Sequence, residues 1–189
     1  MFLFDADGTL FDYDMAEENA LKIMFDHYDL EYSENVRLKY QEINSHAWKS
    51  YENNEITKTE LQTLRFTRLF NEIGVHCDVN HFNERYLNEL GKGSFLTDGA
   101  LEICREITSC NKKIYIVTNG ILATQEARIE HSAIKKYISG FFVSEFIGYQ
   151  KPHALYFEYV FSHIPQIDRD KILIIGDSLS ADIAGGNNS

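Results

Sequence analysis

The sequence predicts an α/β protein with a Rossmann-like, doubly wound parallel sheet. Four short apolar runs have the length and the Ile, Val and Phe content of buried strands. From residue 99 onward, amphipathic helical patterns separate these runs, and strands that alternate with helices form parallel sheets with right-handed crossovers. The chain has 189 residues and is 44% hydrophobic, so it can bury a core of this kind.

The strands and helices of the sheet region are predicted from these patterns. The strands are expected at residues 2–4, 114–117, 141–143 and 172–175. One helix is expected to present the apolar stripe Leu101, Ile103, Cys104 and Ile107, and another the stripe Tyr156, Phe157, Val160 and Phe161. Pro152 stands where the second of these helices is expected to start.

Residues 15–92 interrupt the alternation with three or four helical patterns and no convincing strand. Ser33 is a candidate cap for a helix that reaches about residue 51. Thr57 and Glu60 form a capping box for the next helix, and Gly74 is placed to end it. We therefore predict an α/β core of residues 1–14 and 93–189, with an inserted helical domain of residues 15–92. Its glutamates, such as Glu17, are expected on the solvated surface.

The charge balance excludes several classes of partner. Lys and Arg number 18 against 29 Asp and Glu, so the formal charge is −11. Such a chain repels nucleic-acid polymers and anionic membranes. No apolar run approaches the roughly 18 residues of a membrane span, and Met1 leads to Asp5 without a basic, apolar leader. We expect a cytoplasmic protein whose three cysteines remain reduced.

Polar residues follow each of the four predicted strands. These endings are Asp5-Ala6-Asp7-Gly8-Thr9, Thr118-Asn119-Gly120, Lys151-Pro152 and Gly176-Asp177-Ser178, the last followed by Asp182. In open α/β sheets the carboxyl ends of the strands meet at one crevice. Carboxylates crowded at one point repel each other unless a cation neutralises them. A divalent ion that prefers oxygen ligands, Mg²⁺, would resolve this conflict.

The remaining residues at these endings suit phosphoryl transfer. Thr118, Asn119 and Lys151 can donate hydrogen bonds to a phosphoryl group. Asp5, at the end of its strand, can attack phosphorus and form an aspartyl phosphate. Asp7 can protonate the leaving oxygen and later deprotonate water. Gly8 permits the sharp turn that brings backbone amides close to the phosphate.

The four motifs, in this order and with a helical insertion after the first, resemble the haloacid dehalogenase superfamily of aspartyl-phosphate phosphatases. The segment from Phe4 to Asp12, FDADGTLFD, matches the first motif in full. The resemblance implies that Asp5 is the nucleophile and that Asp7 is the general acid/base. It also implies that Mg²⁺ is held by Asp5, by the backbone carbonyl of Asp7 and by Asp177, with support from Asp182.

Within that superfamily the insertion looks like the helical cap. Its residues Trp48, Glu52, Ile56, Thr57, Leu61, Arg65 and Phe66 are similar to the YjjG-like 5′-nucleotidase group. The resemblance implies a nucleoside 5′-monophosphate as substrate. If the cap closes over the crevice, it is expected to contact the leaving group, and changes at Trp48 or Arg65 are expected to alter the ranking of substrates. Family members continue beyond residue 189 into another strand and helix, so we expect the core to be truncated there.

Two other functions remain open at this point. A phosphosugar phosphatase or mutase of the same superfamily would share the acceptor Asp5, and a mutase would return the phosphate to a substrate hydroxyl. A binding module would keep the fold without turnover, although the presence of both Asp5 and Asp7 argues against it. In every enzymatic case the expected partner is a small phosphomonoester.

Overall fold

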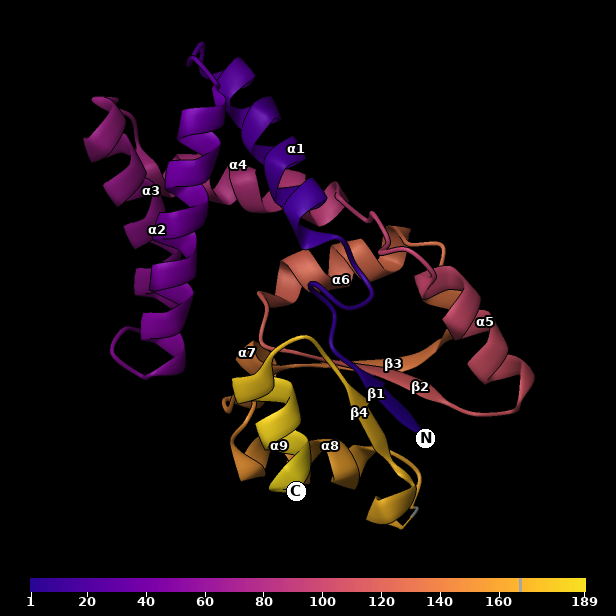
Figure 1. Ribbon diagram of the computed structural model, residues 1–189. Coiled ribbons are helices and arrows are strands. Elements are labelled where there is room, and N and C mark those ends of the chain that lie inside the picture. Colours follow the sequence, from indigo (N-terminus) through magenta and orange to yellow (C-terminus); the bar gives the residue numbers. More distant parts are fainter. Residues whose placement is uncertain (167) are drawn as a thin grey trace. The chain divides into compact units, whose positions relative to one another are not determined.

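The computed structural model describes residues 1–166 and 168–189 (Figure 1). The chain divides into two compact units. Met1–Ala16 and Gly91–Ser189 form the α/β unit, and Glu17–Leu90 forms the helical unit. Within the part of the chain that the structure describes, no helix has both the length and the apolar character needed to cross a membrane.

The α/β unit is built on a parallel sheet of four strands in the order β3-β2-β1-β4. The strands are β1 (Phe2–Phe4), β2 (Ile114–Thr118), β3 (Ile138–Val143) and β4 (Leu173–Ile175). The helices between and after them are α5 (Ala100–Ser109), α6 (Leu122–His131), α7 (Ser144–Ile147), α8 (Ala154–His163) and α9 (Ala184–Asn187). Shorter helical turns are η1 (Lys135–Tyr137), η2 (Arg169–Lys171) and the π-helical turn η3 (Leu179–Ile183). This arrangement confirms the predicted α/β fold class.

Alternating side chains of the strands supply two cores, one on each face of the sheet. Phe4, Ile114 and Ile116 pack with Cys104 and Ile107 of α5. On the opposite face, the neighbouring strand residues Leu3, Tyr115 and Val117 pack with Tyr156, Phe157 and Val160 of α8. Figure 1 shows α5 and α6 on one side of the sheet and α8 and α9 on the other. Because both faces are covered, the central strands read as continuous apolar runs.

Three local expectations for this unit were wrong. Ile103 is 44% exposed, because the buried stripe of α5 runs through Ala100, Cys104 and Ile107 and Ile103 lies to one side of it. β3 begins at Ile138 rather than at residue 141, where Ser139 and Gly140 had interrupted the apolar run. α8 begins at Ala154, and the ring of His153 accepts a hydrogen bond from Leu155 N (3.1 Å), so Pro152 lies in the preceding turn.

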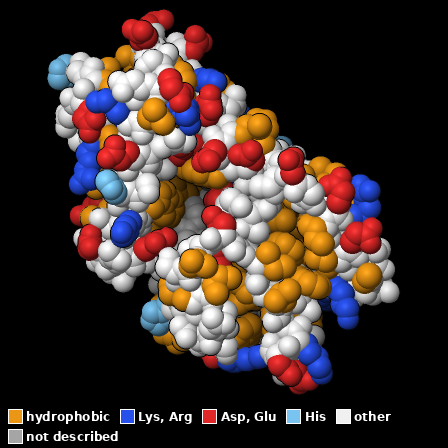
Figure 2. Space-filling model, in the orientation of Figure 1, with side chains coloured by type: hydrophobic (Ala, Val, Ile, Leu, Met, Phe, Trp, Pro, Cys, Tyr) orange, Lys and Arg blue, Asp and Glu red, His pale blue; other side chains and the backbone are white. Residues whose placement is uncertain are grey.

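The helical unit draws on four helices whose ends follow local sequence signals. They are α1 (Tyr13–His27), α2 (Glu34–Glu52), α3 (Lys58–Ile73) and α4 (Val79–Lys92). Ser33 caps α2, and the predicted capping box of Thr57 and Glu60 begins α3. Gly74 ends α3 at φ 69°, in the left-handed region that glycine tolerates. On the face shown in Figure 2, acidic and basic side chains are interspersed over the surface.

A buried polar network links the four helices of this unit. Asn44 on α2 donates to Glu17 on α1 (2.8 Å). Arg65 on α3 donates to the side-chain oxygens of Asn44 (3.4 Å) and of Asn83 on α4 (3.1 Å). The Arg65 guanidinium lies 5.2 Å from the centre of the Tyr86 ring. Glu17 is only 2% exposed, so its expected place on the surface was wrong, and Arg65 is a core residue.

Replacement of Arg65 by Met should destabilise the helical unit. The substitution removes the charged donor to the buried side-chain oxygens of Asn44 and Asn83, and a hydrogen bond from a charged group contributes about 1.5–3 kcal/mol. Urea unfolding followed by fluorescence reports on this unit, because the single tryptophan, Trp48, lies in α2. Arg68→Met on the same helix is the control, since Arg68 is exposed and should change stability by less than about 0.5 kcal/mol. Equal transitions for both variants would contradict the structural role of Arg65.

Candidate functional site

Asp5 and Asp177 lie at the topological switch point of the sheet, where the order of the strands reverses. From β1 the strands proceed through β2 to β3 on one side, and the chain then returns to place β4 on the other side of β1. Ligands of open α/β sheets bind at the carboxyl ends of the strands at such a point. Asp5 directly follows β1, Asp177 follows β4 by two residues, and Asp5 N donates to the carbonyl of Ile175 (2.8 Å). The backbone ladder thus places these carboxyl groups at one edge of the sheet.

Lys151 is the buried cation of this site. Its Nζ donates to Asp5 Oδ1 (2.6 Å), to Asp182 Oδ1 (2.6 Å) and to the carbonyl of Val117 (2.7 Å). The Lys151 side chain is 2% exposed and that of Asp182 is 1% exposed. All three protons of the ammonium group therefore have acceptors, as a desolvated lysine requires.

Asn119 holds the backbone of Lys151 in place. Lys151 follows β3 by eight residues, beyond α7. Asn119 Oδ1 accepts from Lys151 N (2.8 Å), and Asn119 Nδ2 donates to the Lys151 carbonyl (3.0 Å). Thr118, the last residue of β2, is buried and accepts from Gly120 N (3.0 Å). Phosphate binding by Thr118, Asn119 and Lys151 stays a prediction.

Gly8 and the turn η3 shape the acidic side of the site. Gly8 has φ +77°, and a Cβ there would lie 2.7 Å from Asp177 Oδ2, so another side chain would clash with that carboxylate. Asp182 lies in η3 and accepts from Ser178 N (3.1 Å) through Oδ2. π-Helical turns occur frequently at functional sites. Here the turn points Asp182 inward to Lys151.

The three carboxyl groups of Asp5, Asp177 and Asp182 form an acidic cluster. One oxygen of each lies within 4.8 Å of the others. Asp7 and these three carboxylates, set against Lys151 and Arg128, leave two excess negative charges when all are ionised. Oxygen ligands with this charge fit a hard divalent cation such as Mg²⁺. The Asp7 carboxylate lies outside the cluster, and its predicted contribution through a backbone carbonyl stays a prediction.

Burial perturbs the proton affinity of these groups. It raises the pKa of Asp5 to about 7; Lys151 opposes this rise, and the charges of Asp182 and Asp7 add to it. Burial also raises the pKa of Asp177, with Asp182 and Asp7 adding to the rise. For Lys151 burial lowers the pKa, but the charges of Asp5 and Asp182 outweigh burial and the net shift is upward. The surroundings thus favour the protonated forms of Asp5 and Asp177.

Two residues that the sequence analysis missed hold Asp7. Gln125 Nε2 donates to Asp7 Oδ2 (2.6 Å), and Arg128 Nη1 forms an ion pair with Asp7 Oδ1. Both side chains are buried and lie on α6, directly after the polar ending of β2. Their signal in the sequence was two polar residues three positions apart on α6, next to the buried Ile129.

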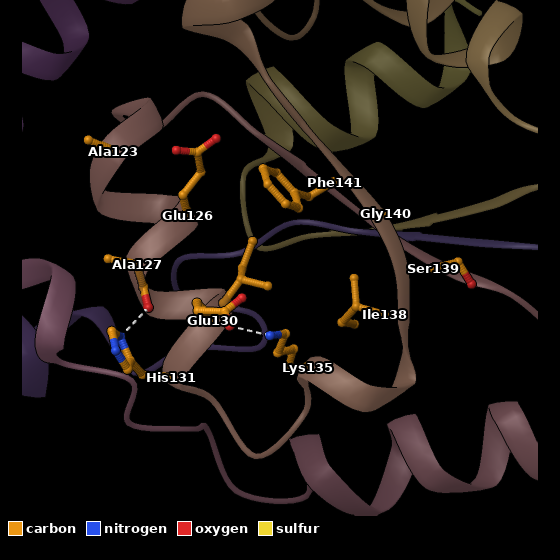
Figure 3. A pocket seen from close by; sticks show the side chains of 11 residues that line it. Ala123, Glu126, Ala127, Glu130, His131, Lys135, Ile138, Ser139, Gly140 and Phe141 are labelled. Carbon is orange, nitrogen blue, oxygen red and sulfur yellow. Dashed lines mark hydrogen bonds and ion pairs between the residues drawn. The ribbon is translucent and has the colours of Figure 1, made fainter.

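The other face of α6 lines an open hollow of about 660 Å³ (Figure 3). Ala127 and Glu130 of α6 face Lys135 and Phe141 across it, and Lys135 forms an ion pair with Glu130. Gln125 and Arg128 are not among its lining residues, nor is any residue of the acidic cluster. α6 therefore presents one face to Asp7 and a different face to this hollow.

Three known proteins are similar to this chain in sequence over nearly its whole length. YfnB of Bacillus subtilis (strain 168), named a HAD-hydrolase, is 38% identical over 184 residues, which are 97% of this chain and 78% of YfnB. The pyrimidine 5′-nucleotidase PynA of Streptococcus pneumoniae (strain ATCC BAA-255 / R6) is 36% identical over 99% of this chain and 79% of its own length. The pyrimidine 5′-nucleotidase YjjG of Escherichia coli (strain K12) is 32% identical, over 98% and 80%.

The fold comparison agrees with the sequence comparison. A magnesium-bound crystal structure of YfnB superimposes with a TM-score of 0.92 at 37% identity, covering 99% of this chain and 83% of that one. The sequence model of the haloacid dehalogenase-like hydrolase family matches residues 1–189 of this chain. Together with the resemblance of the four strand endings, these matches show that the chain belongs to the haloacid dehalogenase-like hydrolase family.

Proposed function

We propose that this protein is a Mg²⁺-dependent phosphatase that hydrolyses a nucleoside 5′-monophosphate through an aspartyl phosphate on Asp5. The observation that carries the proposal is the contact of Asp5 with Lys151 beside the carboxylates of Asp177 and Asp182. Two relatives named pyrimidine 5′-nucleotidases support the substrate class and favour a pyrimidine base. The magnesium-bound structure of YfnB supports the choice of metal.

The first step forms the phosphoenzyme. Lys151 holds Oδ1 of Asp5, and an Asp5 oxygen forms a bond to phosphorus while the bond from phosphorus to the nucleoside oxygen breaks. The electron pair leaves with that oxygen, which takes a proton from Asp7. Mg²⁺, held by the acidic cluster and the Asp7 carbonyl, would neutralise charge on the phosphoryl oxygens when bound.

The second step restores the enzyme. Asp7 takes a proton from water, and the water oxygen bonds to the phosphorus of the aspartyl phosphate. The bond between phosphorus and the Asp5 oxygen breaks, so phosphate leaves and the carboxylate is regenerated. Lys151 stays bound to Asp5 and Asp182 and stabilises the carboxylate that reappears. The two steps together consume the phosphomonoester and one water molecule, and they return Asp5 and Asp7 to their starting protonation states.

The helical unit is proposed to act as a cap that selects the leaving group. The structure of YfnB is described as revealing interdomain movement, and a cap that closes over a site excludes water from it. Arg65 takes no part in this proposal, because its side chain is buried inside the helical unit.

The test is hydrolysis of a panel of phosphomonoesters by the purified protein in the presence of Mg²⁺. Pyrimidine and purine nucleoside 5′-monophosphates, hexose phosphates and para-nitrophenyl phosphate are compared by release of inorganic phosphate. We expect kcat/KM to be highest for a pyrimidine nucleotide. A hexose phosphate that is isomerised without phosphate release would show a mutase, and the absence of turnover on every ester would overturn the proposal.

Mg²⁺ affinity should rise with pH below neutrality. Burial raises the pKa of Asp5 from its ordinary value of 3.8 to about 7. Between these values the folded state binds more protons than the unfolded state, so stability falls as pH rises. Mg²⁺ requires the ionised carboxylate, so its binding displaces that proton. We expect the affinity to increase by up to about tenfold per pH unit from about pH 5.5 to 7.

Calorimetric titration in two buffers of different ionisation enthalpy measures both the affinity and the released proton. Asp5→Asn should bind Mg²⁺ more weakly and release less proton. Asp98→Asn, an exposed residue before α5, is the control and should match the wild type. Equal Mg²⁺ affinity at both ends of this pH range would contradict the prediction.

A further inference from the structure

The Asp7 carboxylate is held by two side chains of one helix. We propose that Gln125 and Arg128 of α6 are positioning residues that orient Asp7 for proton transfer to the leaving group. This inference rests on the proposed function, because it assigns the two residues to the acid/base step of the same site.

Each oxygen of Asp7 has its own donor. Gln125 Nε2 donates to Oδ2 (2.6 Å), and the Arg128 guanidinium pairs with Oδ1. The two donors stand three residues apart, so they project from the same face of α6 on successive turns. Two contacts from a rigid helix fix both the position and the plane of the carboxylate, whereas one contact would leave it free to rotate.

Arg128 is itself held on the side away from Asp7. Its Nε donates to the carbonyl of Gly93 (3.1 Å), and its guanidinium carbon lies 4.9 Å from the centre of the Phe11 ring. The Arg128 side chain is fully buried, while the Asp7 side chain is 28% exposed. The donor is therefore fixed in the core, and Asp7 keeps the access to solvent that exchange with a leaving group and water requires.

Apart from the contact of Arg128 with the Gly93 carbonyl, the side-chain hydrogen bonds of this pair go to Asp7. Arg128 Nη2 and Gln125 Oε1 are buried and have no hydrogen-bond partner among the residues that the structure describes. Buried polar groups that serve only stability are nearly always satisfied, because an unsatisfied one destabilises the fold. Two such groups beside one candidate acid/base indicate that the Gln125 and Arg128 side chains are placed to hold the Asp7 carboxylate.

Gly120 leaves the room that Gln125 occupies. A Cβ at Gly120 would lie 2.4 Å from Gln125 Nε2 and 2.8 Å from its Cγ, so no other residue at this position lets the amide reach Asp7 unchanged. Gly120→Ala is thus a second way to displace Gln125 without altering any group on Asp7 or on Gln125.

The experiment compares leaving groups. An alkoxide leaving group needs protonation by Asp7, whereas para-nitrophenolate needs little. Misplacement of a reacting group by about 1 Å can cost about 10²-fold. We expect Gln125→Met and Arg128→Met to lower kcat for a nucleoside 5′-monophosphate by about 10- to 100-fold. Phosphoenzyme formation from para-nitrophenyl phosphate, measured by rapid quench, should fall by less than about threefold.

Controls separate positioning from folding. Thr124→Val changes a buried polar residue of the same helix and should leave the ratio of the two rates unchanged. Arg128→Lys retains the charge and should recover part of the nucleotide rate. In an Asp7→Asn background, Arg128→Met should cause no further change in that ratio, because the group it positions is gone. Circular dichroism and thermal midpoints check that each variant is folded, and Gln125→Met and Gly120→Ala test the idea if Arg128→Met does not fold.

The outcomes distinguish this inference from the proposed function. Equal losses on both leaving groups, or losses that add fully to those of Asp7→Asn, would overturn the positioning role while the phosphatase proposal stands. A wild-type protein that hydrolyses no phosphomonoester would overturn the phosphatase proposal, and the positioning role with it.

Discussion

Asp5→Asn is expected to abolish turnover of every phosphomonoester, whatever its leaving group. The amide keeps the shape of the side chain but removes the nucleophilic oxygen, so no aspartyl phosphate forms. Because the nucleophile takes part in each substrate's first step, an activated aryl phosphate cannot rescue the variant. We expect a rate at the detection limit, a loss of at least about 10⁴-fold, which is of the size seen when a catalytic nucleophile is removed.

The measurement is steady-state phosphate release together with rapid-quench trapping of labelled phosphoenzyme. Lys151 still has Asp182 and the Val117 carbonyl as acceptors in this variant, so the fold should persist, and circular dichroism tests that. Asp98→Asn makes the same chemical change at an exposed position and should retain full activity. Label on the Asp5→Asn protein would show that another residue is the nucleophile.

Asp7→Asn is expected to separate the two half-reactions. The nucleophile remains, but the proton donor and the base are removed, so turnover of a nucleotide should fall by about 10² to 10⁴-fold. An aryl phosphate should lose less in the first step. The phosphoenzyme should then accumulate, because no base activates the water that would hydrolyse it.

Rapid quench with a labelled aryl phosphate measures that accumulation directly. We expect label on most of the Asp7→Asn protein during turnover and none on the double variant Asp5→Asn/Asp7→Asn. Normal turnover of the nucleotide by Asp7→Asn would exclude Asp7 as the acid/base, and a phosphoenzyme that decays at the wild-type rate would restrict its role to the first step.

Local signals in the sequence were sufficient for the main elements of the fold. Caps and boxes act through hydrogen bonds between residues three or four apart, so Ser33, Thr57 and Gly74 identified helix ends before any packing was known. The apolar runs predicted the central strands for the same reason, since burial on both faces is written into consecutive residues. Where the pattern was interrupted, as at Ser139 and Gly140, the start of β3 was misplaced.

In the candidate site too, local sequence predicted some residues, and only the tertiary structure revealed others. The residue types at the ends of β1 and β4 predicted a set of carboxylates at one sheet edge, because parallel strands bring their carboxyl ends together. The contacts of Asp7 with Gln125 and Arg128 join positions 118 and 121 residues apart. Apart from their spacing of three positions beside Ile129, nothing in the local pattern of α6 distinguishes these two residues from solvated ones, so sequence reasoning missed them.

By itself, the sequence determined the α/β class, the helical insertion and the chemical types of the residues at the strand ends. Only the tertiary structure decided which charges are buried and what they face. Lys151 became a buried cation between Asp5 and Asp182, Glu17 and Arg65 became core residues of the helical unit, and Arg128 was joined to Asp7. The physical reason is that helix and strand periodicity depends on neighbours within a few residues, whereas the burial and pairing of a charge depend on every element that packs around it.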